Sequence, residues 1–421
     1  MPENVIDVLQ KRGFIDNLTS SEIESLCQKP IKLYIGFDPT ADSLHLGSLV
    51  GIIAMAWFQK YGHEPVALLG GATGLIGDPS GKSLERPYLD TQTLEKNIQG
   101  IAKNLNDILN RDHHGSVSIV NNYDWYQKMD FLSFLRQVGS HFRLSPLLSR
   151  DTVKTRLSTQ EGMSFKEFTY PLLQAYDFYR LFEDQSIMLQ IGGADQWTNI
   201  TSGIELIRKK TQKEAYGLTF PLLVKSDGKK FGKTESGTIW LSKEKCSAYD
   251  FYKYLYRVAD DDVISLLKRL TFLPMSEIKQ IEKNIPTEPN AAQKILASEV
   301  TRIVHGEKEL KVALEVTEQM RPGSDAHLSL QELKLLSEKV PHVILQREAV
   351  LEKKLIDVIC EAQILTSKGE ARRLIQNGGL YLNNERITDT AKTLTSNDLI
   401  EEQCLLLALG KKRKVVIFFE N

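Results

Sequence analysis

IKLYIGFDPTADSLHLGSLVGIIAMAWFQKY, residues 31–61, joins a strand to a helix through a polar turn. The apolar run 31–37 predicts a buried strand, and the apolar-rich segment 47–61 predicts a helix that ends at Gly62. The turn contains Pro39, whose ring fixes the backbone there. Strand, turn and helix in this order form the repeating unit of α/β proteins with parallel sheets.

Short apolar runs alternate with helical spacing through the first half of the chain. Further strands are predicted at 65–69, 117–120 and 187–191, and a helix at 91–109. This alternation predicts an α/β fold, a Rossmann-like doubly wound parallel sheet, over residues 1–225. Ligands of such sheets bind at the carboxyl ends of the strands, so the polar segments that follow the strands are the candidate site.

The second half is predicted to be an all-α domain followed by a small α+β module. Apolar residues at three- and four-residue steps predict helices at 249–259, 261–269, 276–284 and 290–305. We expect a loop and connection at 226–247, an α-helical domain at 248–320, a linker at 321–350 that begins with RPGS, and a module at 351–421. In the module we expect two helices, the second at 367–376, and short strands around 380–387 and 415–419.

Composition and charge exclude several classes of protein. Because the net charge is -1, any binding of nucleic acid would depend on local basic patches. The four cysteines form no C-x-x-C pair, which argues against a zinc ribbon or a disulfide framework and favours a reducing compartment. We expect no signal peptide and no membrane segment, since the longest apolar run, 49–58, is too short to cross a bilayer. These features favour the cytoplasm.

Two polar segments have the chemistry to handle phosphate. His45 lies at the start of the predicted helix, where unpaired N–H groups favour an anion, although it could equally be a helix-capping or packing residue. The segment 225–234, KSDGKKFGKT, carries four lysines and two glycines. Such a loop suits a departing pyrophosphate, and its alternative interpretation is a solvated hairpin. The presence of both segments favours a triphosphate site.

A third segment, 70–83, is rich in glycine but is not a P-loop. A Walker A motif needs a glycine five positions before its final Gly-Lys-Ser run, and that position holds Ile76. A GxGxxG motif is also absent, because Gly70 and Gly71 are adjacent. We therefore exclude P-loop NTPases and dinucleotide enzymes. Asp78, Lys82 and Arg86 remain as candidates for ligand contact.

Two further segments suit a binding pocket. Tyr170, Gln174 and Asp177 are spaced by four and three residues, so they share one face of a helix. Segment 190–196, QIGGADQ, ends a predicted strand with glycines and an acid, which would let a nucleoside approach the backbone and donate its ribose hydroxyls. Taken singly, both patterns are also common in purely structural settings.

These segments together resemble the class I aminoacyl-tRNA synthetases, and within them the bacterial tyrosyl-tRNA synthetases over almost the whole chain. The matching pieces, in chain order, are 34–40, His45-Leu46-Gly47 as the HIGH signature, 77–82, 170–177, 190–196 and 230–234 as the KMSKS signature. The resemblance implies that tyrosine, ATP and tRNA(Tyr) are the substrates, with Mg²⁺ accompanying ATP and no bound prosthetic group or protein metal site.

The resemblance also implies a role for each candidate residue. Tyr34 and Asp177 would bind the phenolic hydroxyl of tyrosine, Asp78, Tyr170 and Gln174 its α-amino group, and Gln196 the region of its carboxyl. ATP or the adenylate would contact Gly36, Asp38, His45, Gly47, Ser48, Gly192, Asp195 and Lys233. The catalytic set would be Thr40 and His45 at the γ-phosphate side, with Lys82, Arg86, Lys230, Lys233 and Thr234 around the pyrophosphate.

Two positions depart from the general signatures. Ser48 stands where HIGH has its final histidine, and its hydroxyl would still reach a ribose oxygen. Phe231-Gly232 replaces the Met-Ser of KMSKS, a form that resembles the tyrosine enzymes in particular.

The chemistry needs no general base, because the substrate carboxylate is already a nucleophile near neutral pH. Catalysis then depends on positioning and on electrostatic stabilisation.

The module at 351–421 resembles the S4-like RNA-binding domain. The expected RNA-binding residues are Lys368, Arg372 and Arg373 on one helical face, with Lys411, Lys412 and Arg413 as a second basic cluster. By the same resemblance the helical domain would bind the anticodon stem, and the protein would be a homodimer with Phe165 and segment 131–142 in the interface. Two rivals stay open: a tryptophan–tRNA ligase, and an RNA-binding factor on a synthetase scaffold that has lost catalysis.

Overall fold

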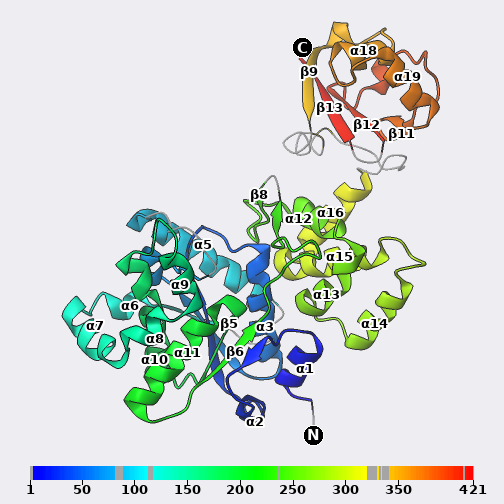
Figure 1. The fold of residues 1–421 in the computed structure, drawn as a ribbon. Helices are drawn as coiled ribbons and strands as arrows, with labels where there is room; N and C mark the ends of the chain where they lie inside the picture. Colours follow the sequence, from blue (N-terminus) through cyan, green and yellow to red (C-terminus); the bar gives the residue numbers. More distant parts are fainter. Residues whose placement is uncertain are drawn as a thin grey trace. The chain divides into compact units, whose positions relative to one another are not determined.

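The computed structural model describes residues 3–80, 89–111, 117–234, 237–319, 330, 333, 341–410 and 413–420. The chain divides into two compact units, 1–309 and 310–421. Figure 1 colours both units along the sequence and labels their helices and strands.

The first unit is built on a six-stranded sheet in the order β1-β6-β5-β2-β3-β4. Its strands are β1 Asn17–Leu18, β2 Lys32–Phe37, β3 Glu64–Leu69, β4 Ser118–Asn121, β5 Leu189–Gly193 and β6 Tyr216–Phe220. Strands β2 to β6 are parallel, and only β1 pairs antiparallel, with β6. The strand order reverses between β2 and β5, and this switch point is where open parallel sheets bind ligands.

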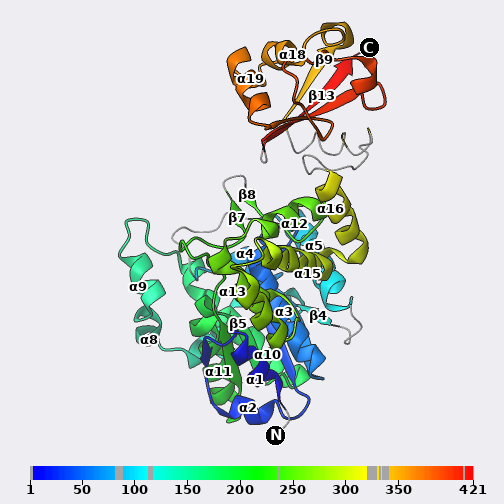
Figure 2. The ribbon, with the colours of Figure 1, turned by 90° about the vertical axis from the view of Figure 1, so that its right-hand side faces the viewer.

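Helices cover both faces of this sheet. On β2, Tyr34 packs against Phe178 of α10 (Phe165–Gln185), with ring centroids 5.3 Å apart. The next residue, Ile35, faces α3 (Leu49–Lys60), where a Cβ added to Gly51 would lie 3.4 Å from the Ile35 Cδ1. Consecutive residues of a strand point to opposite faces, so β2 contributes to both layers. The two views of Figures 1 and 2 show the sheet between these helices.

Helix α10 carries the predicted polar stripe and is fixed at its start. Ser164 caps it by accepting a hydrogen bond from the Glu167 N–H. The Glu167 carboxylate is buried and pairs with Arg156 of α9 (Asp151–Leu157), with Nη2 and Oε2 2.7 Å apart. Because a buried charge is costly without a partner, this pair fixes the first turn of α10 against α9.

The remaining elements of the first unit include helices before residue 30 and between residues 123 and 148 that were not predicted from the sequence. Before and beside the sheet lie α1 Val5–Lys11, α2 Glu22–Leu26, α4 Thr73–Ile76, α5 Thr91–Leu109, α6 Tyr123–Tyr126, α7 Phe131–Gln137, α8 Leu144–Leu148 and α11 Trp197–Thr211. After the hairpin of β7 Lys233–Thr234 and β8 Gly237–Thr238 come α12 Ala248–Tyr256, α13 Asp260–Leu270, α14 Met275–Asn284, α15 Ala291–His305 and α16 Glu307–Gln319. The helix α16 was not predicted from the sequence, and it runs across the boundary between the two units.

The second unit contains a five-stranded sheet in the order β11-β10-β12-β13-β9. Its strands are β9 His342–Gln346, β10 Leu380–Leu382, β11 Glu385–Arg386, β12 Cys404–Leu409 and β13 Arg413–Glu420, and α18 Leu355–Glu361 and α19 Lys368–Gln376 pack their apolar residues with it in one core. The linker expected over 321–350 is therefore too long, because residues 342–346 form β9, which pairs parallel to β13. Among the helices that the structure describes in either unit, none has the length and apolarity to cross a membrane.

Candidate active site

A pocket of about 560 Å³ opens at the carboxyl ends of β2 and β5. Nearly all of the described candidate residues line it, and they come from distant parts of the chain. They are Tyr34, Gly36, Asp38, Thr40, His45, Gly47, Ser48, Asp78, Tyr170, Gln174, Asp177, Gly192, Asp195, Gln196, Lys230 and Lys233. Thr234 does not line the pocket but lies next to it in β7, and Lys82 and Arg86 lie outside the described residues.

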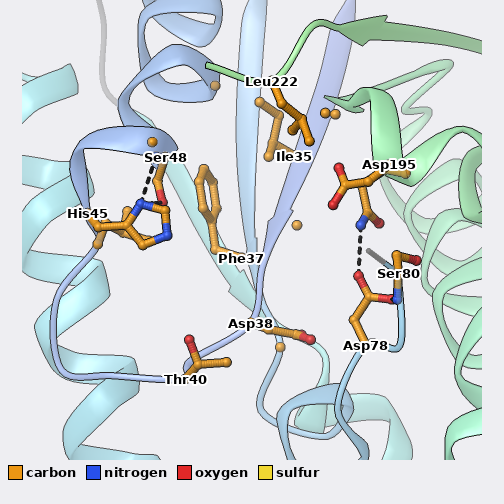
Figure 3. Close-up of a pocket in the computed structure, with 18 of the residues that line it drawn as sticks. Ile35, Phe37, Asp38, Thr40, His45, Ser48, Asp78, Ser80, Asp195 and Leu222 are labelled. Carbon is orange, nitrogen blue, oxygen red and sulfur yellow. Dashed lines mark hydrogen bonds between the residues drawn. The ribbon is translucent and has the colours of Figure 1, made fainter. Parts of the chain in front are cut away.

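The pocket has two sides, separated by the end of β2. Figure 3 shows His45 and Ser48 on one side of Ile35 and Phe37, with Asp78 and Asp195 on the other. The imidazole side is next to the start of α3, and the acidic side faces α10 and α11. This division would place phosphate groups and an amino acid at opposite ends of one cavity.

The deepest polar group on the acidic side is the Asp177 carboxylate. It is 1% exposed and accepts hydrogen bonds from Asn122 Nδ2 at 3.0 Å and Trp125 Nε1 at 2.9 Å. Burial raises the pKa of Asp177 to about 7, and the hydrogen bonds from Asn122 and Trp125 oppose that rise because they stabilise the ionised form. The nearby hydroxyl of Tyr34 is fully buried and has no hydrogen-bond partner among the described residues.

Sequence reasoning missed Asn122 and Trp125. Asn122 directly follows β4, so the rule that polar groups after parallel strands form the site could have found it. Trp125 lies on the short helix α6 and has no such signal, because a tryptophan there would ordinarily be assigned to the core.

A second network joins the strand end of β2 to helix α10. Tyr170 Oη donates to Asp38 Oδ2 at 2.9 Å, and Thr73 Oγ1 donates to Asp38 Oδ1 at 2.8 Å. Burial, with Asp38 and Asp78 nearby, raises the pKa of Tyr170 well above its ordinary value, so its phenol stays protonated. The carboxylate of Asp38 is thereby fixed in one orientation at the rim of the cavity.

A third network links the loop at Asp78 to the start of α11. Gln196 Nε2 donates to Asp78 Oδ2 at 2.7 Å. Asn199 Nδ2 lies 3.1 Å from Gln174 Oε1, 3.2 Å from Gln196 Oε1 and 3.3 Å from Ser80 Oγ. The buried amide of Asn199, which was not predicted, therefore orients two glutamines that were.

His45 stands at the first turn before α3. It caps the short 3₁₀ turn Leu46–Ser48, where its Nδ1 accepts from the Ser48 N–H at 3.3 Å. A Cβ at Gly47 would lie 3.0 Å from the imidazole, so glycine is needed there for the ring to hold this position. The capping alternative is thus correct in part, and the ring still lines the pocket.

The lysine loop, residues 225–234, lies beside that turn. Gly232 has φ +82°, and a Cβ there would lie 3.1 Å from the Leu46 Cβ. Both features require glycine, which accounts for the Phe231-Gly232 departure from KMSKS. The side chains of Lys230 and Lys233 are exposed, and neither forms an ion pair with a described residue. The ammonium groups of Lys230 and Lys233, which form no ion pair with a described residue, therefore border the same cavity as His45.

Comparison with known proteins identifies the family of the chain. The family model of tRNA synthetases class I (W and Y) matches residues 26–320, and the model of the tyrosine--tRNA ligase SYY-like C-terminal domain matches residues 332–417. The chain belongs to the tyrosine--tRNA ligases, a family of class I aminoacyl-tRNA synthetases. It is therefore an enzyme that ligates tyrosine to tRNA.

Individual relatives cover nearly the whole chain. The tyrosine--tRNA ligase of Protochlamydia amoebophila is 54% identical over 98% of this chain and 98% of its own length. The chloroplastic/mitochondrial tyrosine--tRNA ligase of Arabidopsis thaliana is 50% identical over 98% of this chain and 83% of its own. A solved structure of a C-terminally truncated mitochondrial tyrosyl-tRNA synthetase from Aspergillus nidulans is 32% identical, with a TM-score of 0.66 over 74% of this chain and 92% of its own.

Membership of the tyrosine--tRNA ligases decides between the rivals. Relatives at 43–54% identity over nearly the full chain carry the tyrosine activity, so the tryptophan enzyme and the inactive factor are not favoured. A tryptophanyl-tRNA synthetase from Plasmodium falciparum shares the fold at 14% identity and a TM-score of 0.54.

In the described part of the chain, no group of three or more His, Cys, Asp or Glu side chains is placed to hold a metal ion.

The basic residues of the second unit differ in their surroundings. Arg372 and Arg373 are exposed on α19, while Lys368 pairs with Asp357, with Nζ and Oδ1 2.9 Å apart. Arg413 Nη2 donates to the Ile364 carbonyl at 2.7 Å, so part of its guanidinium is engaged within the module. Lys411 and Lys412 lie outside the described residues.

Proposed function

We propose that Tyr34 and Asp177 bind the phenolic hydroxyl of tyrosine at the deep end of the pocket. The observation that carries the proposal is a buried Tyr34 hydroxyl, which has no hydrogen-bond partner within the described part of the chain, in the same cavity as a buried Asp177 carboxylate. A phenol would donate to the carboxylate and accept from the hydroxyl. A phenylalanine ring would leave both buried groups without that partner, and an unsatisfied buried polar group is costly.

The α-amino group of tyrosine would lie among Asp78, Tyr170 and Gln174. These three side chains face the pocket from α10 and from the loop after α4. The substrate carboxylate would then point past Gln196 toward ATP, whose ribose would donate to Asp38 or Asp195. Gly36 has open space where a Cβ would stand, which would leave room for the nucleoside against the backbone, and Gly192 lines the same pocket.

Adenylate formation would take place between the two sides of the pocket. A carboxylate oxygen of tyrosine attacks the α-phosphorus of ATP, and the bond from that phosphorus to the oxygen bridging the β-phosphate breaks. Thr40, His45, Lys230 and Lys233 would stabilise the charge that develops on the leaving pyrophosphate, with Thr234, Lys82 and Arg86 completing the set. Mg²⁺ would arrive as part of the ATP complex, held mainly by the phosphates.

Transfer to tRNA would follow at the same pocket. A hydroxyl of the 3′-terminal adenosine of tRNA(Tyr) attacks the tyrosyl carbonyl, and AMP leaves. We assign RNA binding to Arg372, Arg373 and Lys368 on α19, to the basic cluster Lys411–Arg413, and to the helices α12–α16. For Arg413 the hydrogen bond to Ile364 makes a structural role within the module equally important.

We also propose that the enzyme is a homodimer that works in the cytoplasm. Large apolar side chains gather on the outside of the first unit: Phe131 is 63% exposed, Leu132 74%, Leu144 61% and Phe165 67%. An exposed apolar surface of this kind suits a second copy of the chain, and it includes the predicted Phe165 and 131–142. The four cysteines are free thiols, in keeping with a reducing compartment.

The amino-acid assignment is tested by pyrophosphate exchange with tyrosine, phenylalanine and tryptophan. We expect exchange with tyrosine alone for the wild type, and a large loss of tyrosine binding for Asp177→Asn. The double variant Lys230→Ala, Lys233→Ala should bind tyrosine normally and fail to form the adenylate. Normal adenylate formation by that double variant would refute the role given to the lysines.

A further inference from the structure

The lysine loop is tied to two helices of the same unit through its backbone. The Gly232 N–H donates to Tyr254 Oη on α12 at 2.9 Å, and the Ser226 N–H donates to Asp262 Oδ1 on α13 at 2.8 Å. These two hydrogen bonds bracket the central part of the loop. Figure 2 shows β7 and β8, which follow directly on the loop, beside α12.

Tyr254 makes a second contact at the same place. Its ring meets the ring of Phe231 edge-on, with centroids 5.4 Å apart, and Phe231 is buried. One side chain of α12 therefore holds both the side chain of Phe231 and the peptide N–H that follows it. This peptide lies between the two lysines that border the pocket, Lys230 and Lys233.

The other side of the Gly232 peptide is fixed as well. Its carbonyl accepts from the Ile239 N–H at 2.9 Å, and the Ile239 carbonyl accepts from the Leu46 N–H at 2.9 Å. A Cβ at Gly232 would lie only 3.1 Å from the Leu46 Cβ, so Leu46 also borders this residue. The backbone of Gly232 is thus held by hydrogen bonds to α12 on one side and to the segment next to His45 on the other. The side chains of the flanking lysines remain exposed.

We propose that Tyr254 is a positioning residue for adenylate formation, and that its hydroxyl holds the Gly232 peptide so that Lys230 and Lys233 face the departing pyrophosphate. Tyr254 is not among the residues that line the pocket, so it acts through the loop and touches neither substrate. The inference rests on the proposed role of the two lysines. Without the hydroxyl, the Gly232 N–H loses its acceptor and the loop samples other positions.

The test is Tyr254→Phe, which keeps the ring that packs on Phe231 and removes only the hydroxyl. We expect the single-turnover rate of adenylate formation to fall about threefold to tenfold, the range that a net hydrogen bond corresponds to. The dissociation constant for tyrosine should not change. Tyr256→Phe is the matched control, because Tyr256 lies on the same helix, is 36% exposed and stacks on Tyr252 with no hydrogen bond to another described residue. Its rate should equal that of the wild type.

A double-mutant cycle with Lys233→Ala shows whether Tyr254 acts through the lysines. In that background Tyr254→Phe should lower the rate by a smaller factor than it does in the wild type, because one of the two lysines that it positions is gone. An undiminished effect there, or a wild-type rate for Tyr254→Phe alone, overturns the inference. If Lys233→Ala itself reacts at the wild-type rate, the proposed role of the loop fails instead, so the two failures are distinguishable.

A second readout concerns the loop itself. Trypsin cleaves after lysine, and Lys229, Lys230 and Lys233 are exposed. Native Tyr254→Phe protein should be cut in the loop several times faster than the wild type and Tyr256→Phe. Equal cleavage rates for all three proteins would show that the hydroxyl does not hold the loop.

Discussion

Asp177 is a carboxylate whose charge is costly in the free protein and useful in the complex. Burial raises its pKa to about 7, so near neutral pH a substantial part of it is protonated before tyrosine binds. Only the ionised form accepts hydrogen bonds from Asn122, from Trp125 and from a phenol together. With the proposed role of Asp177 at the phenol, the affinity for tyrosine would depend on the protonation state of this single carboxyl group.

The first prediction is a pH dependence of tyrosine binding. A raised pKa means that Asp177 loses its charge as the pH falls through about 7, so the dissociation constant for tyrosine should rise below that pH, by at most about tenfold per unit. Equilibrium dialysis between pH 5.5 and 8.5 measures it. Trp125→Phe removes one donor to the ionised form and should move the inflection to higher pH. A flat profile for the wild type would contradict this account.

At the scale of elements, the two signature segments act as one structure. The turn of His45 and the lysine loop are far apart in sequence, yet each is bonded to the chain around Ile239. Gly232 is the point of closest approach, because it combines φ +82° with contact to Leu46. Gly228, in the same loop, has φ +79° but open space around it.

The two glycines make a matched pair for the second prediction. Gly228→Ala should cost only backbone strain, about 1 kcal/mol, and leave adenylate formation nearly unchanged. Gly232→Ala carries the same strain plus the clash with Leu46, so it should displace the loop and slow adenylate formation at least tenfold while tyrosine still binds. Stopped-flow measurement of the single-turnover rate compares them, and equal effects of both substitutions would contradict the role of the close approach.

Within the first unit, Arg12 joins the start of the chain to the helical part. Its guanidinium donates to the carbonyls of Lys268 and Thr271, both at 3.0 Å, and to that of Leu273, which follows α13. It also lies over the Trp57 ring, 4.4 Å from the centroid. Burial lowers the pKa of Arg12 to about 10, which still leaves it charged at neutral pH.

The third prediction is that Arg12→Ala destabilises the first unit by about 2–4 kcal/mol, because it leaves buried carbonyls unpaired and removes packing on Trp57. Lys11→Ala is the control, because Lys11 pairs with Glu3 on the surface and exposed ion pairs contribute little to stability. Urea unfolding of both variants measures the difference. Similar unfolding midpoints for the two variants would show that Arg12 does not stabilise the packing of the N-terminal segment against the helices.

Much of the fold was predictable from hydrophobic periodicity. The helix expected at 91–109 is α5, and the strand expected at 31–37 is β2 with its first residue at Lys32. Both patterns are strong because one face of the helix and most of the strand are buried. The strands β6 and β12 were missed, since YGLTF contains a glycine and a threonine and CLLLAL does not differ from a buried helix in its pattern.

The candidate site was predictable where a motif marked it and not elsewhere. His45 and Lys233 belong to signatures, and the structure places both at one pocket. Four further side chains are placed by hydrogen bonds: Asn122 and Trp125 donate to Asp177, Asn199 donates to two glutamines, and Tyr254 accepts from Gly232. Such bonds depend on which segments meet in space. No spacing along the chain encodes that Tyr254 lies against Gly232. The linker boundary was wrong for a related reason, because β9 is a strand only through its pairing with β13.

Strand β2 has a consequence for how this enzyme can change over evolution. Alternate side chains of β2 face α10, on the side of the pocket proposed for the tyrosine ring, and α3, and the strand leads directly into the segment of His45. Inserting or deleting a single amino acid between 32 and 37 would exchange those two faces and shift everything downstream by one place. Point substitutions in β2 could therefore change the preference for one amino acid over another during evolution. The insertion or deletion of one codon would instead disrupt both amino-acid binding and catalysis.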